Sequence, residues 1–154
     1  MVQIIPASIA HVPLLAALQN ASFPDDPWPE SAFAPLLAPP TGLGLLADHE
    51  TPIGFALARV IVDEAEIISL GVIPTARRHG YARVILRALI GECQRHGAGN
   101  LFLEVAARNE PAKALYRAEG FCAVGKRRGY YQNGDDAVLM RRSIARTELQ
   151  RCTQ

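Results

Sequence analysis

The chain has 154 residues, enough for one domain with a buried core, and 49% of them are hydrophobic. Charged residues make up 20%, and the formal net charge of +1 predicts no surface for nucleic acid or for an anionic membrane. The N-terminus lacks a basic region followed by an apolar core, and no apolar run is long enough to span a bilayer. We therefore expect a cytoplasmic protein.

Hydrophobic periodicity and the positions of proline and glycine predict alternating strands and helices. The expected strands are, in chain order, residues 2–5, 42–47, 53–60, 66–72, 100–105, 121–127 and 137–142. The expected helices begin near His11 or Val12, after the Pro-rich residues 23–30, after Gly80 and at Glu110. Residues 42–47 and 53–60 flank a polar turn and predict an antiparallel hairpin. Residues 66–72 and 100–105 flank a helix, so they should run parallel in a right-handed crossover.

The most informative stretch surrounds the start of the third helix. An apolar strand ends at Val72, a basic loop with residues 77–79 closes on Gly80, and an amphipathic helix follows. Free N–H groups in a first helical turn bind anions, and glycine permits close approach. Neither common nucleotide loop is present, because the stretch lacks both G-x-G-x-x-G and a Lys-Ser/Thr pair. The stretch predicts an anion cradle; the alternative is an ordinary strand–loop–helix with a solvated basic loop.

Several segments carry a family resemblance. Residues 77–82 resemble the pyrophosphate loop Q/R-x-x-G-x-G/A of the GNAT N-acetyltransferases, and residues 109–121 resemble their N-x-x-A-x-x-L-Y-x-x-x-G-F segment. Four further segments resemble F-x-x-x-P-W, L-E-V-R-x-x-N, R-x-x-Y-Y and D-A-x-x-M of the bacterial ribosomal-protein-alanine N-acetyltransferases, at residues 23–28, 103–109, 127–131 and 136–140. One departure is Ala107, which precedes Arg108 and shifts the basic residue relative to the subgroup's Glu-Val-Arg run.

The resemblance covers residues 1 to about 142 and implies a fold. We expect one α/β (α+β) domain over residues 1–142, with the GNAT fold, and a polar tail over residues 143–154. The fold implies a central mixed, mostly antiparallel sheet of about seven strands, about four helices, and a parallel pair splayed to hold acetyl-CoA. Acetyl-CoA is the implied co-substrate. No metal is expected, because the three cysteines lack metal-ligand spacing.

The resemblance also implies a set of cofactor contacts. Backbone N–H groups from Arg77 to Ala82 would hold the pyrophosphate, and the Val72 end of its strand would pair with the pantetheine arm and polarise the thioester carbonyl. The side chains of Arg77 and Arg78 reach either solvent or a CoA phosphate, so the binding prediction rests on the backbone and Gly80. The full implied set is Leu70, Val72, Arg77, Arg78, His79, Gly80, Tyr81, Ala82, Asn109, Ala112 and Tyr116.

Glu104 is the predicted catalytic base. Alternation along its strand puts Leu103 and Val105 on one face, and Phe102 and Glu104 on the other. A mid-strand carboxylate among apolar residues needs a partner. As a base it would act on the acceptor amine directly or through one water; the alternatives are a surface-facing carboxylate or a core salt bridge. An α-amine, with a reference pKa of about 8 against about 10 for lysine, is the easier acceptor to deprotonate.

Tyr116 is the predicted acid that protonates the leaving thiolate. It follows Asn109 by seven residues, almost two helical turns, so both side chains project from the same side of the helix. The resemblance implies that Asn109 lies near the pantetheine and the Tyr116 hydroxyl near the sulfur. Alternatively, Asn109 only caps the helix and Tyr116 is a core aromatic residue.

Acceptor recognition is assigned to Trp28, Tyr130 and Tyr131. Trp28 either packs on the core or forms one wall of a substrate mouth. The resemblance puts the acceptor peptide at the hairpin that carries the two tyrosines, which are otherwise ordinary loop aromatics. In the same hairpin, Asp135 and Asp136 either attract a cationic terminus or solvate a turn.

The predicted activity is acetyl-CoA-dependent N-acetyltransfer to a primary amine, by direct attack in a ternary complex. The expected acceptor is the N-terminal α-amine of a protein such as a ribosomal protein, and the enzyme is expected to be a monomer or weak homodimer. One alternative is a GNAT enzyme that acetylates a small-molecule amine. The other is a CoA-binding regulatory module without turnover.

Overall fold

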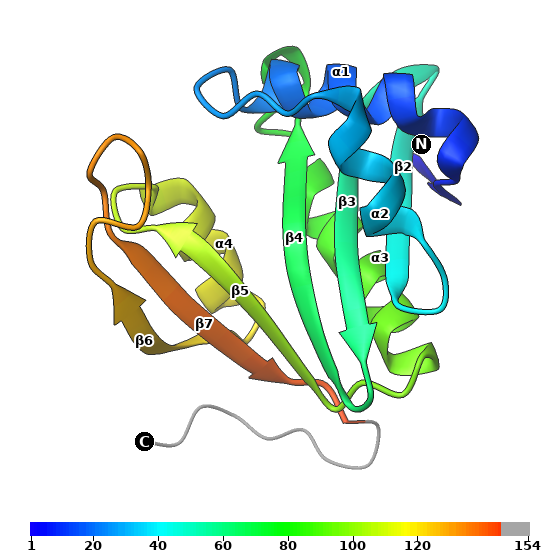
Figure 1. The fold of residues 1–154 in the computed structure, drawn as a ribbon. Coiled ribbons are helices and arrows are strands. Elements are labelled where there is room, and N and C mark those ends of the chain that lie inside the picture. Colours follow the sequence, from blue (N-terminus) through cyan, green and yellow to red (C-terminus); the bar gives the residue numbers. More distant parts are fainter. Residues whose placement is uncertain (146–154) are drawn as a thin grey trace.

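Seven strands form one mixed sheet with helices on both faces, in a computed structural model that describes residues 1–145 (Figure 1). The strands are β1 (Gln3–Pro6), β2 (Gly42–His49), β3 (Thr51–Ile61), β4 (Glu64–Val72), β5 (Asn100–Ala106), β6 (Cys122–Arg127) and β7 (Ala137–Ser143). The α-helices are α1 (Val12–Ser22), α2 (Phe33–Leu37), α3 (Tyr81–Arg95) and α4 (Glu110–Ala118), and short 3-10 turns cover Ile9–His11, Glu30–Ala32 and Pro74–Ala76. The strand order is β1-β2-β3-β4-β5-β7-β6, in which β4 and β5 are parallel.

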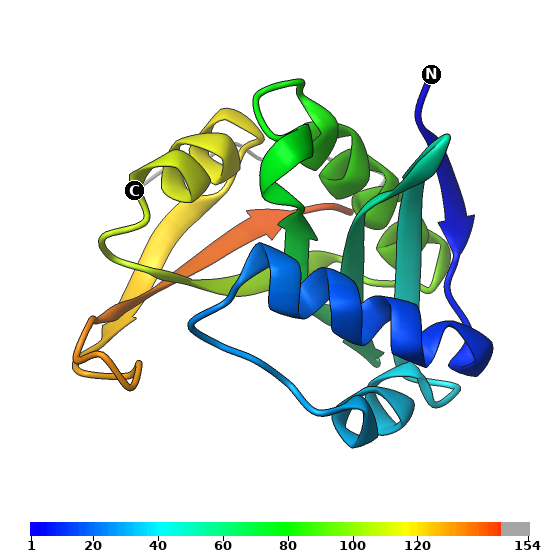
Figure 2. The ribbon, with the colours of Figure 1, turned by 90° about the horizontal axis from the view of Figure 1, so that it is seen from above.

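The helices divide between the two faces of the sheet. α1 and α2 cover one face, and α3 and α4 cover the other (Figure 2). Under α1 and α2 the core contains Phe33 and Phe55, and under α3 it contains Leu86 and Leu101, all fully buried. Burial of each such side chain stabilises the fold by about 1.5–3 kcal/mol. The predicted apolar faces of the helices therefore hold both layers on the sheet.

The predicted fold class is confirmed, with differences in detail. β2 and β3 are longer than predicted, because their ladder continues to the pair of His49 with Thr51 across a turn at Glu50, whose φ is 67°. The last hairpin places β7 beside β5 and leaves β6 outermost, an order that the sequence did not indicate. Ile144, which the prediction assigned to the tail, is 2% exposed and donates its N–H to the Gly99 carbonyl at 2.9 Å. The rest of the predicted tail, from residue 146, lies outside the described residues.

The parallel pair separates after three residue pairs. The last pair joins Glu66 with Phe102, and beyond it β4 pairs with β3 while β5 pairs with β7. Ile68 is an extra residue in β4 directly after this point, since the register with β3 shifts there. Such a bulge bends its strand and increases its twist. Figure 1 shows the resulting V between β4 and β5, whose inner edges carry backbone groups that no longer pair with each other.

Candidate active site

The predicted anion cradle lies where the loop after β4 enters α3. Gly80 precedes the helix with a φ of +78°, a left-handed conformation that favours glycine. An added Cβ at Gly80 would meet no atom within 4 Å, so the position requires glycine for its backbone angle alone. Within the described chain no side chain caps α3, so the first-turn N–H groups of Tyr81 and Ala82 remain available. The loop therefore fits a diphosphate group.

The side chains of the loop mostly contact the protein itself. Arg77 donates from Nε to the Val72 carbonyl at 2.9 Å and from Nη2 to the Ser22 carbonyl at 2.8 Å. His79 places Nδ1 2.8 Å from the Arg77 carbonyl, and its ring stacks on Tyr81 at 5.6 Å between centroids. Both side chains therefore already have hydrogen-bond or stacking partners within the protein. This arrangement agrees with a cradle made of backbone N–H groups.

Leu70 and Val72 border the V, and Asn109 and Ala112 lie at the start of α4. Leu70 and Val72 lie in β4 beyond the last pair with β5, along the inner edge of the V. Asn109 caps α4, because its Oδ1 accepts a hydrogen bond from the Ala112 N–H at 3.2 Å. The capping role left open above is thus observed, and it leaves the amide nitrogen of Asn109 for a ligand.

Tyr116 is a buried residue of α4. It is 8% exposed and contacts Phe121 edge-on, with 5.6 Å between ring centroids. Burial, and secondarily the nearby Tyr131, raise the pKa of Tyr116 to about 12. The phenol therefore stays protonated at neutral pH, as a proton donor must.

Glu104 lies in β5 with its carboxylate near Arg127. The side chain is 16% exposed, and Oε2 is buried with no hydrogen-bond partner among the described residues. Arg127 Nε lies 3.6 Å from Oε2, too far for a hydrogen bond. Glu104 is therefore not a surface-facing carboxylate, whereas the salt-bridge alternative is observed as a long ion pair with Arg127, whose side chain is 59% exposed. An unsatisfied carboxylate oxygen of this kind can accept a proton from an amine.

Tyr131 brings the two candidate catalytic residues into one electrostatic environment. Burial first, and then the charge of Glu104, raise the pKa of Tyr131 to about 12. Tyr131 also contributes to the raised pKa of Tyr116. Tyr130 packs edge-on against Tyr131 at 5.1 Å and is 51% exposed, with the Arg127 guanidinium 5.6 Å from its ring centroid. Tyr131, from the last hairpin, thus lies close enough to Tyr116 of α4 and Glu104 of β5 to interact with both electrostatically.

The loop of residues 23–29, which we call the acceptor loop after its predicted role, lies across the V from the last hairpin (Figure 1 and Figure 2). Trp28 packs at 5.6 Å from Phe33, between ring centroids, and donates its N–H to Asn20 Oδ1 at 3.0 Å. The core-packing alternative is therefore observed for Trp28. Asp26 in the same loop is among the charges that raise the pKa of Tyr131. Its nearness to Tyr131 was not predicted. The two consecutive aspartates in this Pro-rich loop could have suggested a charged residue near the site.

Two further polar residues of the last hairpin have structural roles that sequence reasoning missed. Asp135 is 6% exposed and accepts hydrogen bonds from the N–H groups of Arg108 at 3.2 Å and Asp136 at 2.8 Å. Asp136 accepts from the Gly129 N–H at 2.8 Å. Asp135 therefore ties the hairpin to the loop before α4 and does not merely solvate a turn.

Arg127 was visible in the sequence as the first residue of the R-x-x-Y-Y segment. Its position beside Glu104 depends on the order of the strands in the sheet, which the sequence did not indicate.

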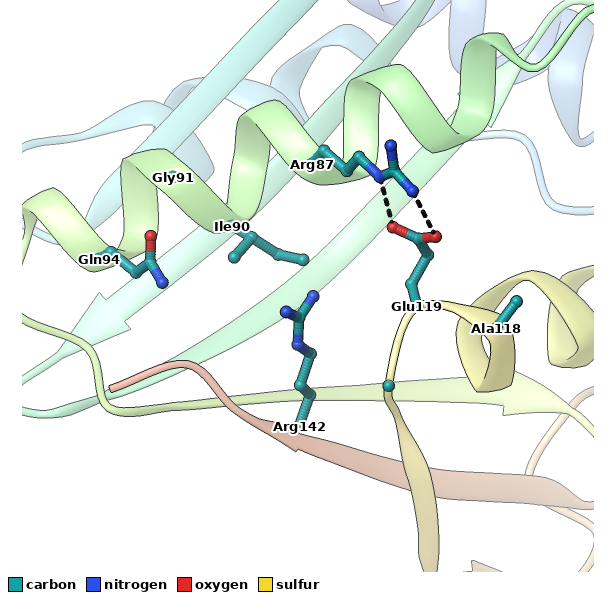
Figure 3. A pocket seen from close by; sticks show the side chains of 8 residues that line it. Arg87, Ile90, Gly91, Gln94, Ala118, Glu119 and Arg142 are labelled. Atoms are coloured by element: carbon teal, nitrogen blue, oxygen red, sulfur yellow. Dashed lines mark hydrogen bonds and ion pairs between the residues drawn. The ribbon is translucent and has the colours of Figure 1, made fainter. Parts of the chain in front are cut away.

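A separate cleft of about 550 Å³ lies between α3 and the end of α4 (Figure 3). Its lining contains none of the predicted site residues; it consists of Arg87, Ile90, Gly91, Gln94, Ala118, Glu119, Gly120 and Arg142. At its edge the Glu119 carboxylate accepts two hydrogen bonds from Arg87, at 2.8 and 3.2 Å, and lies 3.1 Å from Arg83 Nε. The Glu119 side chain is 8% exposed. These contacts fasten the cradle helix to the helix that carries Tyr116.

Replacement of Glu119 by glutamine is expected to lower the melting temperature at pH 7 by a few degrees. The hydrogen bonds from Arg87 hold the pKa of Glu119 below its usual value. Its stabilising effect is therefore complete above the unfolded pKa of about 4.3 and is lost as pH falls through the lower folded value. Thermal unfolding from pH 3 to pH 8 should show the two proteins converging at acid pH. Glu66→Gln, which removes a pair with Arg59 in which both side chains are more than 40% exposed, is the control and should shift little.

The described chain contains neither a membrane-spanning helix nor a cluster of metal ligands. Among residues 1–145, no helix is both long and apolar enough to cross a membrane. Over the same residues, no three His, Cys, Asp or Glu side chains gather in a group that could hold a metal ion.

The known proteins that resemble this chain include several N-acetyltransferases. The chain is 36% identical over 117 residues to the ribosomal protein bS18-alanine N-acetyltransferase of Escherichia coli (strain K12), covering 74% of this chain and 79% of that protein. It is 40% identical over 124 residues to the N-alpha-acetyltransferase RimI of Mycobacterium tuberculosis, covering 77% of each. The crystal structure of the Escherichia coli ribosomal-protein-S18-alanine N-acetyltransferase matches with a TM-score of 0.89 at 29% identity, over 99% of this chain and all of that one.

A more distant structure, Arabidopsis thaliana NAA60 in complex with acetyl-CoA, shares the fold with a TM-score of 0.82 at 21% identity, over 94% of this chain and 99% of that one. The acetyltransferase (GNAT) family itself matches residues 12–121, which include the cradle, the V and α4. The predicted resemblance, fold and enzyme class are thereby confirmed. The chain belongs to the acetyltransferase (GNAT) family.

Proposed function

We propose that this enzyme transfers the acetyl group of acetyl-CoA to the N-terminal α-amine of a protein, such as a ribosomal protein, by direct attack in a ternary complex. The observation that carries the proposal is the V between β4 and β5, which opens beside the first turn of α3, uncapped by any side chain of residues 1–145. The names of its relatives, which specify alanine and α-amine acetylation, support the choice of acceptor. We propose further that it acts in the cytoplasm as a monomer or weak homodimer.

The cradle supplies the first part of the mechanism. First-turn N–H groups of α3 hold the diphosphate, and the inner edge of β4 around Leu70 and Val72 pairs with the pantetheine arm. This edge also directs a backbone donor at the thioester carbonyl, where negative charge develops during attack. The V thus fixes the thioester between the cradle and the acceptor loop.

The side chains supply the proton transfers. Glu104 Oε2, which lacks a hydrogen-bond partner, accepts the proton that the amine loses as its nitrogen bonds to the acetyl carbon. The carbon–sulfur bond breaks, and the Tyr116 hydroxyl donates a proton to the thiolate sulfur. Asp26, Tyr130 and Tyr131 surround the entry and orient the acceptor. The Tyr116 phenol is protonated at neutral pH, as this second transfer requires, because burial raises its pKa to about 12.

A panel of acceptors tests the proposal. Peptides with a free N-terminus should release CoA thiol at a rate that grows with peptide concentration. The same peptides with a formylated N-terminus and an internal lysine should not. Turnover with small amines alone would instead support the small-molecule alternative. Binding of acetyl-CoA without thiol release from any acceptor would support a regulatory module.

A further inference from the structure

The end of α1 lies directly against the end of β4. A Cβ added to Gly71 would lie 2.9 Å from Phe23 Cε2 and 2.9 Å from Ser22 Cβ, closer than atoms normally approach. Glycine at this position therefore allows the two backbones to approach. The part of β4 that borders the V and the first residue of the acceptor loop thus form one packed unit.

Arg77 bridges the same two elements with one side chain. Its Nε reaches the Val72 carbonyl of β4 at 2.9 Å, and its Nη2 reaches the Ser22 carbonyl of α1 at 2.8 Å. A planar guanidinium can hold two such acceptors at once, whereas a lysine ammonium presents a single charged point. The backbone of Arg77, however, belongs to the cradle. One residue therefore connects the cofactor side of the enzyme to the acceptor side.

A second polar bridge runs parallel to the first. Ser69 Oγ, from β4 inside the V, donates to Gln19 Oε1 at 2.7 Å, and Gln19 Nε2 donates to the Asp26 carbonyl at 3.3 Å. Gln19 is 1% exposed, so loss of these bonds would leave buried polar atoms unsatisfied. Asp26 in turn acts electrostatically on Tyr131. The first bridge thus fixes the residue that precedes the acceptor loop, and the second fixes Asp26 within the loop.

We propose that Arg77 is a positioning residue that couples occupancy of the cradle to the conformation of the acceptor loop, and that its guanidinium does not bind phosphate. The inference rests on the proposed function only in naming acetyl-CoA and a peptide as the two ligands. A diphosphate that binds the backbone of residues 77–82 orders the loop from which the Arg77 side chain extends. Ordering of that side chain stabilises the acceptor loop, and by linkage a bound acceptor strengthens cofactor binding equally.

Three variants of the full-length enzyme separate the bridge from the charge. Arg77→Gln removes the charge and both bridging hydrogen bonds, and Arg77→Lys keeps the charge but cannot make both hydrogen bonds. Arg78→Gln removes an equal charge, with any phosphate contact of that side chain, and leaves the bridge intact. For both Arg77 variants, we expect the KM for a peptide acceptor to rise about tenfold, as expected for a lost hydrogen bond to a charged group. The Kd for CoA, measured by calorimetry, should differ little between Arg77→Gln and Arg78→Gln.

Hydrogen exchange gives a readout that needs no acceptor. CoA should slow amide exchange in residues 23–29 of the wild type and of Arg78→Gln, but not of the two Arg77 variants. Equal protection in all four proteins, or a loss of CoA affinity confined to the Arg77 variants, would overturn the inference. Loss of peptide turnover with the protection pattern intact would contradict the proposed function and leave the coupling standing. Failure of CoA to bind the wild type would overturn both.

Discussion

Tyr116→Phe is expected to lower kcat by about 10²–10⁴-fold, the usual contribution of a positioned proton donor. The Kd for acetyl-CoA should stay nearly unchanged, because the substitution removes one oxygen and keeps the ring that packs on Phe121. Burial raises the pKa of Tyr116 to about 12. The hydroxyl is therefore protonated throughout the range of a practical assay, and its ionisation should produce no basic limb below about pH 11.

The measurement is thiol release at saturating acetyl-CoA and peptide from pH 6 to pH 10, with acetyl-CoA affinity determined by calorimetry. A variant that retained the full kcat across this range would show that Tyr116 is not the acid. A rise in the acetyl-CoA Kd with kcat unchanged would instead assign the hydroxyl to cofactor binding. The melting temperature checks that the buried site still packs.

Glu104→Gln is expected to lower kcat by about 10²–10⁴-fold near neutral pH. The amide has nearly the same shape as the carboxylate but cannot take a proton from the acceptor. The defect should shrink as pH rises above about 8, because an N-terminal amine with that reference pKa then loses its proton to solvent. A defect that stayed constant with pH would point to a positioning role and place the base elsewhere.

Glu66→Gln provides a matched control for this experiment. Glu66 and Glu104 both line a hollow of about 280 Å³ on the sheet, and Glu66 pairs with Arg59 at 2.9 Å. The control removes the same charge from the same surface, but from a carboxylate that already has a hydrogen-bonded partner. It should leave the pH dependence of kcat as in the wild type.

Sequence patterns predicted the elements whose signals are local. The apolar spacing of α3 and the Asn109 cap of α4 need only a few neighbouring residues to be recognised, and both appear where expected. The cradle was predicted for the same reason, since Gly80 and the basic loop are adjacent in the chain. Local patterns thus account for most of the fold and for the cofactor side of the site.

What could not be predicted depends on contacts between distant segments. Asp135 reads as a solvated turn residue, and only the packing of the last hairpin against the start of α4 buries it. The Arg77 side chain was expected to reach either solvent or a CoA phosphate, yet its partner Ser22 is 55 residues away in the chain. The bulge at Ile68 marks the start of the V. It could not be predicted, because no glycine or proline occupies this position. The acceptor side of the candidate site depends on such contacts and was therefore less predictable from the sequence than the cofactor side.

The separation of β4 from β5 also bears on how long the protein survives in a cell. Beyond Glu66 and Phe102 the sheet lacks the ladder that would join its two halves, and under the proposed function an extended ligand arm would supply the missing strand. A ligand that binds only the folded form adds stability with its concentration, by about 2.7 kcal/mol at one hundred times its Kd. The supply of acetyl donor would then govern the abundance of this protein as well as its turnover, since a starved population would be cleared faster by proteases.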